Sequence, residues 1–238
     1  MKKLLSLAVF LLLLAFLQAG IVSAAEKFYC TERVKGYDKG NFVIMQGDDV
    51  NLRQEPETGR ILRVLQRHTL LQVLDRKGDW YQVLADGTEG YVYAPFTEAC
   101  RKDMLTQEDF ALGYLALNSR FDKERLEQSL GKCLSSKKEN GRYYYTFSNI
   151  TVGTDKKRKN NVYYKISDPK IITMRGVSIG DDSARAIGQY GTPSTVVYEA
   201  TVVCYEYYFQ DQDDDDYRFA IEVSRSGKIE ALIIEKQK

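Results

Sequence analysis

Residues 49–96 read DVNLRQEPETGRILRVLQRHTLLQVLDRKGDWYQVLADGTEGYVYAPF. Short runs rich in Val, Leu and Tyr alternate here with turn signals such as Lys77-Gly78-Asp79 and Asp86-Gly87. Several short strands at close spacing, without a helical period, are typical of a small β-barrel. Glycine accepts the positive φ angles that tight hairpin turns require. The stretch therefore predicts an all-β barrel with strands at 50–53, 60–65, 70–74, 80–84 and 90–93.

The segment 41–99 resembles the bacterial SH3 domain, the SH3b type found in cell-envelope proteins. The residues that carry the resemblance are Val50-Asn51-Leu52-Arg53, Pro56, Gly78-Asp79-Trp80-Tyr81-Gln82-Val83, Gly87 and Gly90-Tyr91-Val92. Two positions depart from the family pattern, which usually has Gly where His68 stands and often Trp where Tyr91 stands. The resemblance implies a binding module that docks cell-wall peptide bridges or places an attached domain, and that performs no chemistry itself.

Aromatic residues gather on adjacent strands of this predicted barrel, where their rings offer a large contact area at low entropy cost. The ligand-binding residues expected from this pattern are Arg53, Trp80, Tyr81, Tyr91 and Tyr93. Alternatives stay open for three of them. Trp80 and Tyr91 are equally compatible with the barrel core, and Arg53 suits either a carboxylate of the ligand or a partner within the chain.

Residues 1–25 have the order of a secretory signal peptide. Lys2 and Lys3 precede an almost unbroken apolar run at 4–22, and Ser23-Ala24-Ala25 supplies small residues. An uncleaved membrane anchor is the alternative, since the apolar run is long for a signal core. No later segment is apolar enough to span a membrane. We therefore expect an exported protein, periplasmic or extracellular in the cell envelope, with no transmembrane domain after signal cleavage.

The four cysteines are Cys30, Cys100, Cys133 and Cys204. An even number in an exported chain suggests two disulfides, for which three connectivities are possible. The order along the chain favours Cys30–Cys100 and Cys133–Cys204, because each pair would then bracket one domain.

Residues 104–238 predict a separate α+β domain. Helices are indicated after Thr106, over 122–130, and over 181–190, where Gly191 and Pro193 end the last one. The expected strands are 142–147, 162–166, 170–174, 196–209, 217–224 and 228–235.

The blocks 113–132 and 176–193 share one order: an apolar run, a turn, a short helix and a glycine stop. This order predicts a tandem repeat, 104–175 and 176–238, with each short helix packed on an antiparallel meander. The pattern resembles the β-lactamase-inhibitor-protein-like fold and the small lipoprotein of the outer-membrane assembly machinery. Both resemblances imply a non-enzymatic domain that works by binding proteins.

Composition argues against several kinds of chemistry. The only histidine, His68, lies in a polar link and is expected in an exposed turn, so the chain lacks the usual base for nucleophilic catalysis and the usual zinc ligands. The acidic run 211–222 has Asp216 where a calcium loop needs glycine. We therefore expect no catalytic residues, no metal and no cofactor. A net charge of +1 gives the chain no electrostatic reason to bind nucleic acid.

Charge is nevertheless uneven within the second domain. The hairpin tip at 155–161 in the first predicted repeat is basic, and the corresponding tip at 211–216 in the second is acidic. Solvated loops are one interpretation, and self-association or docking of charged partners is the other.

The function expected from the sequence is binding: an SH3b module that holds cell-wall peptide material and a C-terminal domain that engages a protein partner. The alternative is an inhibitor or accessory subunit of an envelope enzyme. A cell-wall hydrolase is a third, disfavoured hypothesis. The sequence leaves the oligomeric state open.

Overall fold

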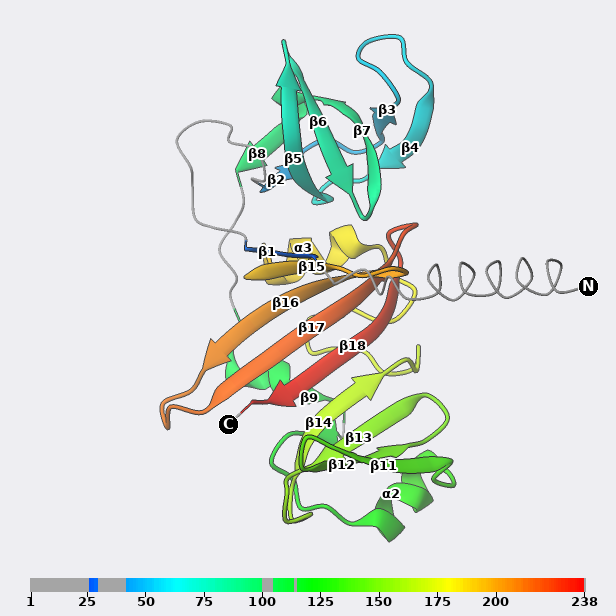
Figure 1. The fold of residues 1–238 in the computed structure, drawn as a ribbon, viewed down its shortest axis with the longest axis vertical. Helices are drawn as coiled ribbons and strands as arrows, with labels where there is room; N and C mark the ends of the chain where they lie inside the picture. Colours follow the sequence, from blue (N-terminus) through cyan, green and yellow to red (C-terminus); the bar gives the residue numbers. More distant parts are fainter. Residues whose placement is uncertain (1–25, 30–41, 100–104, 114, 238) are drawn as a thin grey trace, which may run out of the picture.

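Two antiparallel sheets make up most of the described chain (Figure 1). The computed structural model describes residues 26–29, 42–99, 105–113 and 115–237. The predicted signal peptide and the cysteines Cys30 and Cys100 lie outside these residues. Among the described helices, none combines the length and the apolar character that crossing a membrane requires.

The N-terminal sheet has seven strands in the order β4-β3-β7-β6-β5-β2-β8. Strand β6 shows why this segment forms a half-buried sheet: along it, Tyr81, Val83 and Ala85 are buried while the residues between them are not. Buried side chains from β2, β3, β4, β5, β6 and β7 form one core cluster. The strands are β2 (Phe42–Met45), β3 (Val50–Arg53), β4 (Ile61–Leu65), β5 (Leu70–Lys77), β6 (Trp80–Ala85), β7 (Thr88–Tyr93) and β8 (Thr97–Ala99).

The C-terminal sheet has nine strands in the order β1-β15-β16-β17-β18-β14-β13-β12-β11. Strand β1 precedes the N-terminal domain in sequence but pairs with β15 at one edge of this second sheet. The strands are β1 (Glu26–Tyr29), β11 (Ser135–Glu139), β12 (Arg142–Thr146), β13 (Ile150–Thr154), β14 (Asn161–Ile166), β15 (Thr195–Tyr198), β16 (Val202–Gln210), β17 (Asp216–Ser224) and β18 (Ile229–Lys236).

The same order of elements occurs twice in this domain. Helix α2 (Lys123–Leu130) is followed by β11 to β14, and helix α3 (Ser183–Tyr190) is followed by β15 to β18. The last strands of the two sets, β14 and β18, pair antiparallel and so join both meanders into one sheet. The first set is preceded by a 3-10 helix, η2 (Gln107–Phe110), and the short hairpin of β9 (Ala111–Leu112) and β10 (Leu115–Ala116).

Both helices end at the predicted glycines, and α3 begins two residues after the predicted start at 181. The Asp122 side chain accepts a hydrogen bond from the Arg125 backbone N–H, 3.0 Å away, which caps α2. Gly131 and Gly191 follow the two helices with positive φ angles, a conformation that costs glycine little. Helix α3 buries Ala186, Ile187 and Tyr190 in the main core, whereas α2 only partly buries its apolar side chains.

Two of the expected strands are wrong. The stretch 170–174 contributes only an isolated bridge between Ile172 and Ser178, because the chain turns back at Gly176. The stretch 196–209 is two strands, β15 and β16, joined by a tight turn in which the Glu199 backbone N–H donates to the Val202 carbonyl. The expected set also lacks β11 and β13. None of the residues of β11 is apolar or buried, whereas β13 is short but largely buried.

The predicted Cys133–Cys204 disulfide is also wrong, since both cysteines are free thiols. Cys133 packs against the main core on the helix-covered side of the sheet. Cys204 points to the opposite side of the sheet, where it packs with Ala220 and Ile233. A disulfide needs its two Cβ atoms about 4 Å apart, which thiols on opposite faces of a sheet cannot reach.

Candidate ligand-binding surface

Three aromatic side chains meet at one end of the N-terminal sheet. Trp80 in β6 lies directly opposite Tyr93 in β7, and their ring centroids are 5.5 Å apart in an edge-to-face arrangement. Tyr93 makes a second edge-to-face contact, also at 5.5 Å, with Phe96. Trp80 and Tyr93 are partly exposed, and Phe96 is 48% exposed. We call Trp80, Tyr93 and Phe96 the aromatic surface.

Turns on both sides hold these rings in place. Gly78 has φ +60° and lets the chain reverse between β5 and β6 just before Trp80. The Ala94 backbone N–H then donates to the Asp79 carbonyl across the sheet, 2.8 Å away. Pro95 lies in the 3-10 helix η1 (Ala94–Phe96), and the Phe96 carbonyl accepts a hydrogen bond from the Gln46 backbone N–H at 2.8 Å. The aromatic surface is thus built on hydrogen-bonded backbone.

Tyr91 and Arg53 lie beside the aromatic surface. They pair with each other between β7 and β3, and both are partly exposed. The Arg53 Nη1 donates to the Gly59 carbonyl at 2.9 Å. Of the two partners considered for Arg53, the structure therefore supplies one within the chain. Neither Tyr91 nor Trp80 belongs to the buried core cluster, so the core interpretation does not hold for these two residues.

Tyr81 was predicted to bind the ligand, and the structure shows that this prediction is wrong. It is only 2% exposed and packs inside the N-terminal core, so its side chain cannot contact a ligand at the surface. Successive side chains of a strand point to opposite faces, which puts Tyr81 and Trp80 on different sides of β6. Phe96 takes its place in the cluster. The sequence signal that marks Phe96 is the preceding proline, which ends β7 and turns the chain over its outer face.

Comparison with known families identifies this part of the chain. A family model described as "Bacterial SH3 domain" matches residues 48–98. Residues 48–98 are a bacterial SH3 domain. No curated protein and no solved structure matches the chain.

The opposite end of the SH3 domain is fixed to the C-terminal domain. Figure 1 shows the turn between β6 and β7 directed toward the second sheet, while the turn between β5 and β6 is directed away from it. Phe42, Ile44 and Leu70 of the N-terminal sheet belong to the same buried cluster as Ile187 of α3. The two domains therefore share part of one hydrophobic core.

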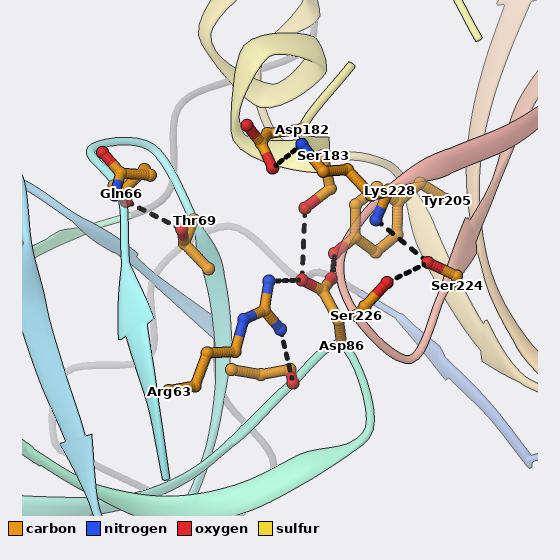
Figure 2. Close-up of polar contacts among 11 residues, drawn as sticks. Arg63, Gln66, Thr69, Asp86, Asp182, Ser183, Tyr205, Ser224, Ser226 and Lys228 are labelled. Carbon is orange, nitrogen blue, oxygen red and sulfur yellow. Dashed lines mark hydrogen bonds and ion pairs between the residues drawn. The ribbon is translucent and has the colours of Figure 1, made fainter. Parts of the chain in front are cut away.

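Asp86 is the polar centre of this contact (Figure 2). Its side chain is fully buried and accepts a hydrogen bond from the Arg63 Nη2 at 3.0 Å. From the C-terminal domain, the Ser183 hydroxyl donates to it at 3.2 Å, and the Tyr205 hydroxyl donates to its other oxygen. Burial raises the pKa of the Tyr205 hydroxyl well above its usual range, and the Asp86 carboxylate adds to the rise, so the phenol keeps its proton to donate.

Glycines allow the two domains to approach closely here. A Cβ on Gly227, in the turn between β17 and β18, would lie 2.0 Å from the Arg63 Nη2. A Cβ on Gly87 would lie 1.9 Å from the Arg225 Nη1. The turn between β6 and β7 and the turn between β17 and β18 therefore pack against each other.

His68 adds a further contact, contrary to the expectation of an exposed turn residue. It does lie in a turn, with φ +69°, but it is only partly exposed. A Cβ on Gly188 of α3 would lie 2.6 Å from the His68 Nδ1, so the imidazole packs directly on the helix backbone. His68 therefore belongs to the contact between the two domains.

Proposed function

We propose that the chain is a non-enzymatic protein of the bacterial cell envelope, whose SH3 domain binds cell-wall peptide material and whose C-terminal domain binds a protein partner. The family match supports a wall-binding module, and the signal-peptide pattern of residues 1–25 supports export. The observation that carries the proposal is the position of the aromatic surface. It lies at the end of β6 farthest from the domain contact, about 20 Å away along the strand.

The aromatic surface suits a peptide ligand. Aromatic rings supply rigid contact area for amide planes and small apolar groups at low entropy cost. Arg53 keeps N–H donors beyond the one that binds Gly59, and these would meet carboxylate or carbonyl oxygens of the peptide. The Tyr91 hydroxyl lies on the same outer face. The arrangement would therefore combine an apolar anchor with a polar flank.

Sedimentation with purified, insoluble peptidoglycan tests the proposal. The intact protein is expected to pellet with the wall material, and Phe96→Ala is expected to lower the affinity at least about tenfold, as loss of an aromatic anchor does at other interfaces. Tyr208→Ala is the matched control, because Tyr208 is an exposed aromatic residue of the C-terminal sheet. We expect it to bind as the unmodified protein does.

Three results would count against this function. The intact protein could stay in the supernatant, or Phe96→Ala could pellet as well as Tyr208→Ala. Time-dependent release of soluble fragments from labelled wall material by the purified protein would show that the chain is an enzyme.

A further inference from the structure

Strand β11 is an exposed edge of the nine-stranded sheet. It pairs with β12 on one side, and no other strand of the described chain pairs with it. All five of its residues, Ser135–Glu139, are exposed. An edge strand presents backbone N–H and C=O groups that point away from the sheet and are able to pair with another chain. Strand β11 lies at the other end of the sheet from α3 and the SH3 domain (Figure 1).

Positive charge surrounds this edge. Lys137 lies over the Tyr144 ring, 5.7 Å from its centroid, and Lys138 lies over the Tyr143 ring at 5.2 Å. Arg158, from the turn between β13 and β14, lies over the same Tyr143 ring at 4.4 Å. We call Lys137, Lys138, Lys156 and Arg158 the basic edge.

Contacts between the elements keep these cations together. A Cβ on Gly141 would lie 3.3 Å from the Lys156 Cε, so the Lys156 side chain runs along the turn between β11 and β12. The acids of the two segments are already engaged. Glu139 pairs with Lys137 at 2.6 Å, and Asp155 accepts backbone hydrogen bonds from Lys157 and Lys159. The segments 135–139 and 155–159 carry six cations and two acids.

An apolar residue stands next to the charged strand. Leu134 directly precedes β11 and is 68% exposed. Its backbone N–H donates to the Thr146 carbonyl at 2.8 Å, which fixes the leucine at the end of the strand pair. The edge therefore offers an apolar anchor, a row of backbone groups and two lysines within one extended segment.

The charge decides which chain can pair with this edge. A second copy of β11 would bring lysine against lysine, and like charges directly opposite each other destabilise a strand pair. Edge lysines are a common device against such self-pairing. An acidic strand would instead meet opposite charge at Lys137 and Lys138.

We propose that β11 accepts an extended, acidic segment of a partner protein as an added strand, with an apolar side chain of that segment on Leu134. The proposal rests on the C-terminal domain being a protein-binding domain. Backbone hydrogen bonds to β11 would supply the strand pairing, and the basic edge would select for acidic residues. Because this edge and the aromatic surface lie at opposite ends of the molecule, one chain could hold both ligands at once.

A blocked synthetic peptide about seven residues long, with glutamate alternating with valine, is the probe. Fluorescence anisotropy of the labelled peptide with the full chain measures binding. We expect saturable binding that weakens as salt rises, and none for the same peptide with lysine in place of glutamate. A third peptide carries N-methyl groups on alternate amides, which removes strand pairing but keeps the charge. It is expected to bind at least about tenfold more weakly.

Variants locate the binding on the protein. Lys137→Glu/Lys138→Glu is expected to weaken binding of the acidic peptide at least about tenfold, because it replaces the two positive charges of β11 by negative ones. Arg60→Glu/Lys77→Glu, which changes the net charge equally on exposed positions of the SH3 domain, should leave the affinity unchanged. Leu134→Ser keeps the charge and should also weaken binding.

Several outcomes would overturn the proposal. The acidic peptide could fail to bind, the N-methylated peptide could bind equally well, or the two double variants could behave alike. A dimer of the protein alone that dissociates on Lys137→Glu/Lys138→Glu would assign the edge to a second copy instead. Sedimentation with peptidoglycan depends on the SH3 domain, so that assay and this one fail independently.

Discussion

Asp86 connects the two domains through contacts that depend on its carboxylate. Both oxygens accept hydrogen bonds, from Arg63 within the SH3 domain and from Ser183 and Tyr205 across the contact. Its backbone has φ +45°, a conformation that aspartate and asparagine tolerate better than most residues. A buried carboxylate with three donors is stable only while all three remain in place.

Replacing Asp86 with asparagine tests this arrangement while keeping the shape and the turn. In asparagine, an NH2 donor replaces one of the two accepting oxygens and would face a group that also donates. The substitution also leaves the Arg63 guanidinium without its counter-charge. We expect the free energy of unfolding to fall by about 2–4 kcal/mol in urea denaturation.

Asp49→Asn is the matched control for this substitution. Asp49 also has a positive φ angle, but it is exposed and accepts its hydrogen bond from the exposed Gln66. We expect a change under about 0.5 kcal/mol. If both substitutions lower the free energy of unfolding equally, the contacts of Asp86 do not stabilise the protein as described.

Cys204 is the residue for which burial has the clearest chemical consequence. Burial raises the pKa of its thiol to about 12, and the Glu206 carboxylate adds to the rise. At pH 8, roughly one Cys204 in ten thousand would then carry the reactive thiolate. We expect iodoacetamide to label Cys204 in the folded protein far more slowly than in urea, as followed by peptide mass spectrometry. A peptide that links Cys133 to Cys204 in a non-reduced digest would contradict the structure directly.

At the scale of elements, the contact of helix α3 with the link between β4 and β5 positions the SH3 domain. Gly188 lies in the last turn of α3, and alanine normally stabilises a helix by up to about 1 kcal/mol relative to glycine. Here the added methyl group would meet the His68 ring. We expect Gly188→Ala to destabilise the protein in urea denaturation, in spite of the higher helix propensity of alanine.

His68→Gly provides the background for this test, because glycine keeps the positive φ angle of the turn and removes the ring. In that background, Gly188→Ala should become neutral or stabilising. If Gly188→Ala has the same effect with and without the His68 ring, the close contact between the helix and the turn is not what matters.

Which elements the sequence could predict depends on how each is buried. Strands β3 to β7 have buried side chains and are separated by short polar turns, most of which contain glycine, so their existence was predictable from pattern alone. Strand β11 has no buried residue and carries no pattern, because its only structural requirement is pairing with β12. The stretch 170–174 has strand-like residues, but the turn at Gly176 folds it back on the segment that follows.

The same limits apply to the candidate ligand residues. The sequence grouped the aromatic residues of β6 and β7 correctly by strand, yet it included Tyr81, whose alternation with Trp80 points it inward. Phe96 lies beyond the end of β7, and only the path of the chain after Pro95 brings it to Tyr93. The contact around Asp86 joins polar residues that lie far apart in the sequence. A local sequence pattern carries no information about such long-range contacts.

At the scale of the whole molecule, the shared core predicts that both domains unfold together. Trp80 is the only tryptophan and reports on the SH3 domain, while the exposure of Cys204 to iodoacetamide reports on the C-terminal sheet. We expect the two probes to follow one urea transition, because Phe42, Ile44 and Leu70 pack in the C-terminal core. Two separated midpoints would show that the domains are independent.

The central claim is that the aromatic surface of the SH3 domain binds cell-wall peptide, and the fluorescence of Trp80 tests it most directly. The single tryptophan lies within the proposed site, so a soluble peptide fragment of the wall should change its emission in a saturable way. We predict such a titration for the intact protein and for Tyr208→Ala, and an affinity at least about tenfold lower for Phe96→Ala. Emission that stays constant up to about 1 mM peptide, or a titration of Phe96→Ala indistinguishable from that of the intact protein, would contradict the claim.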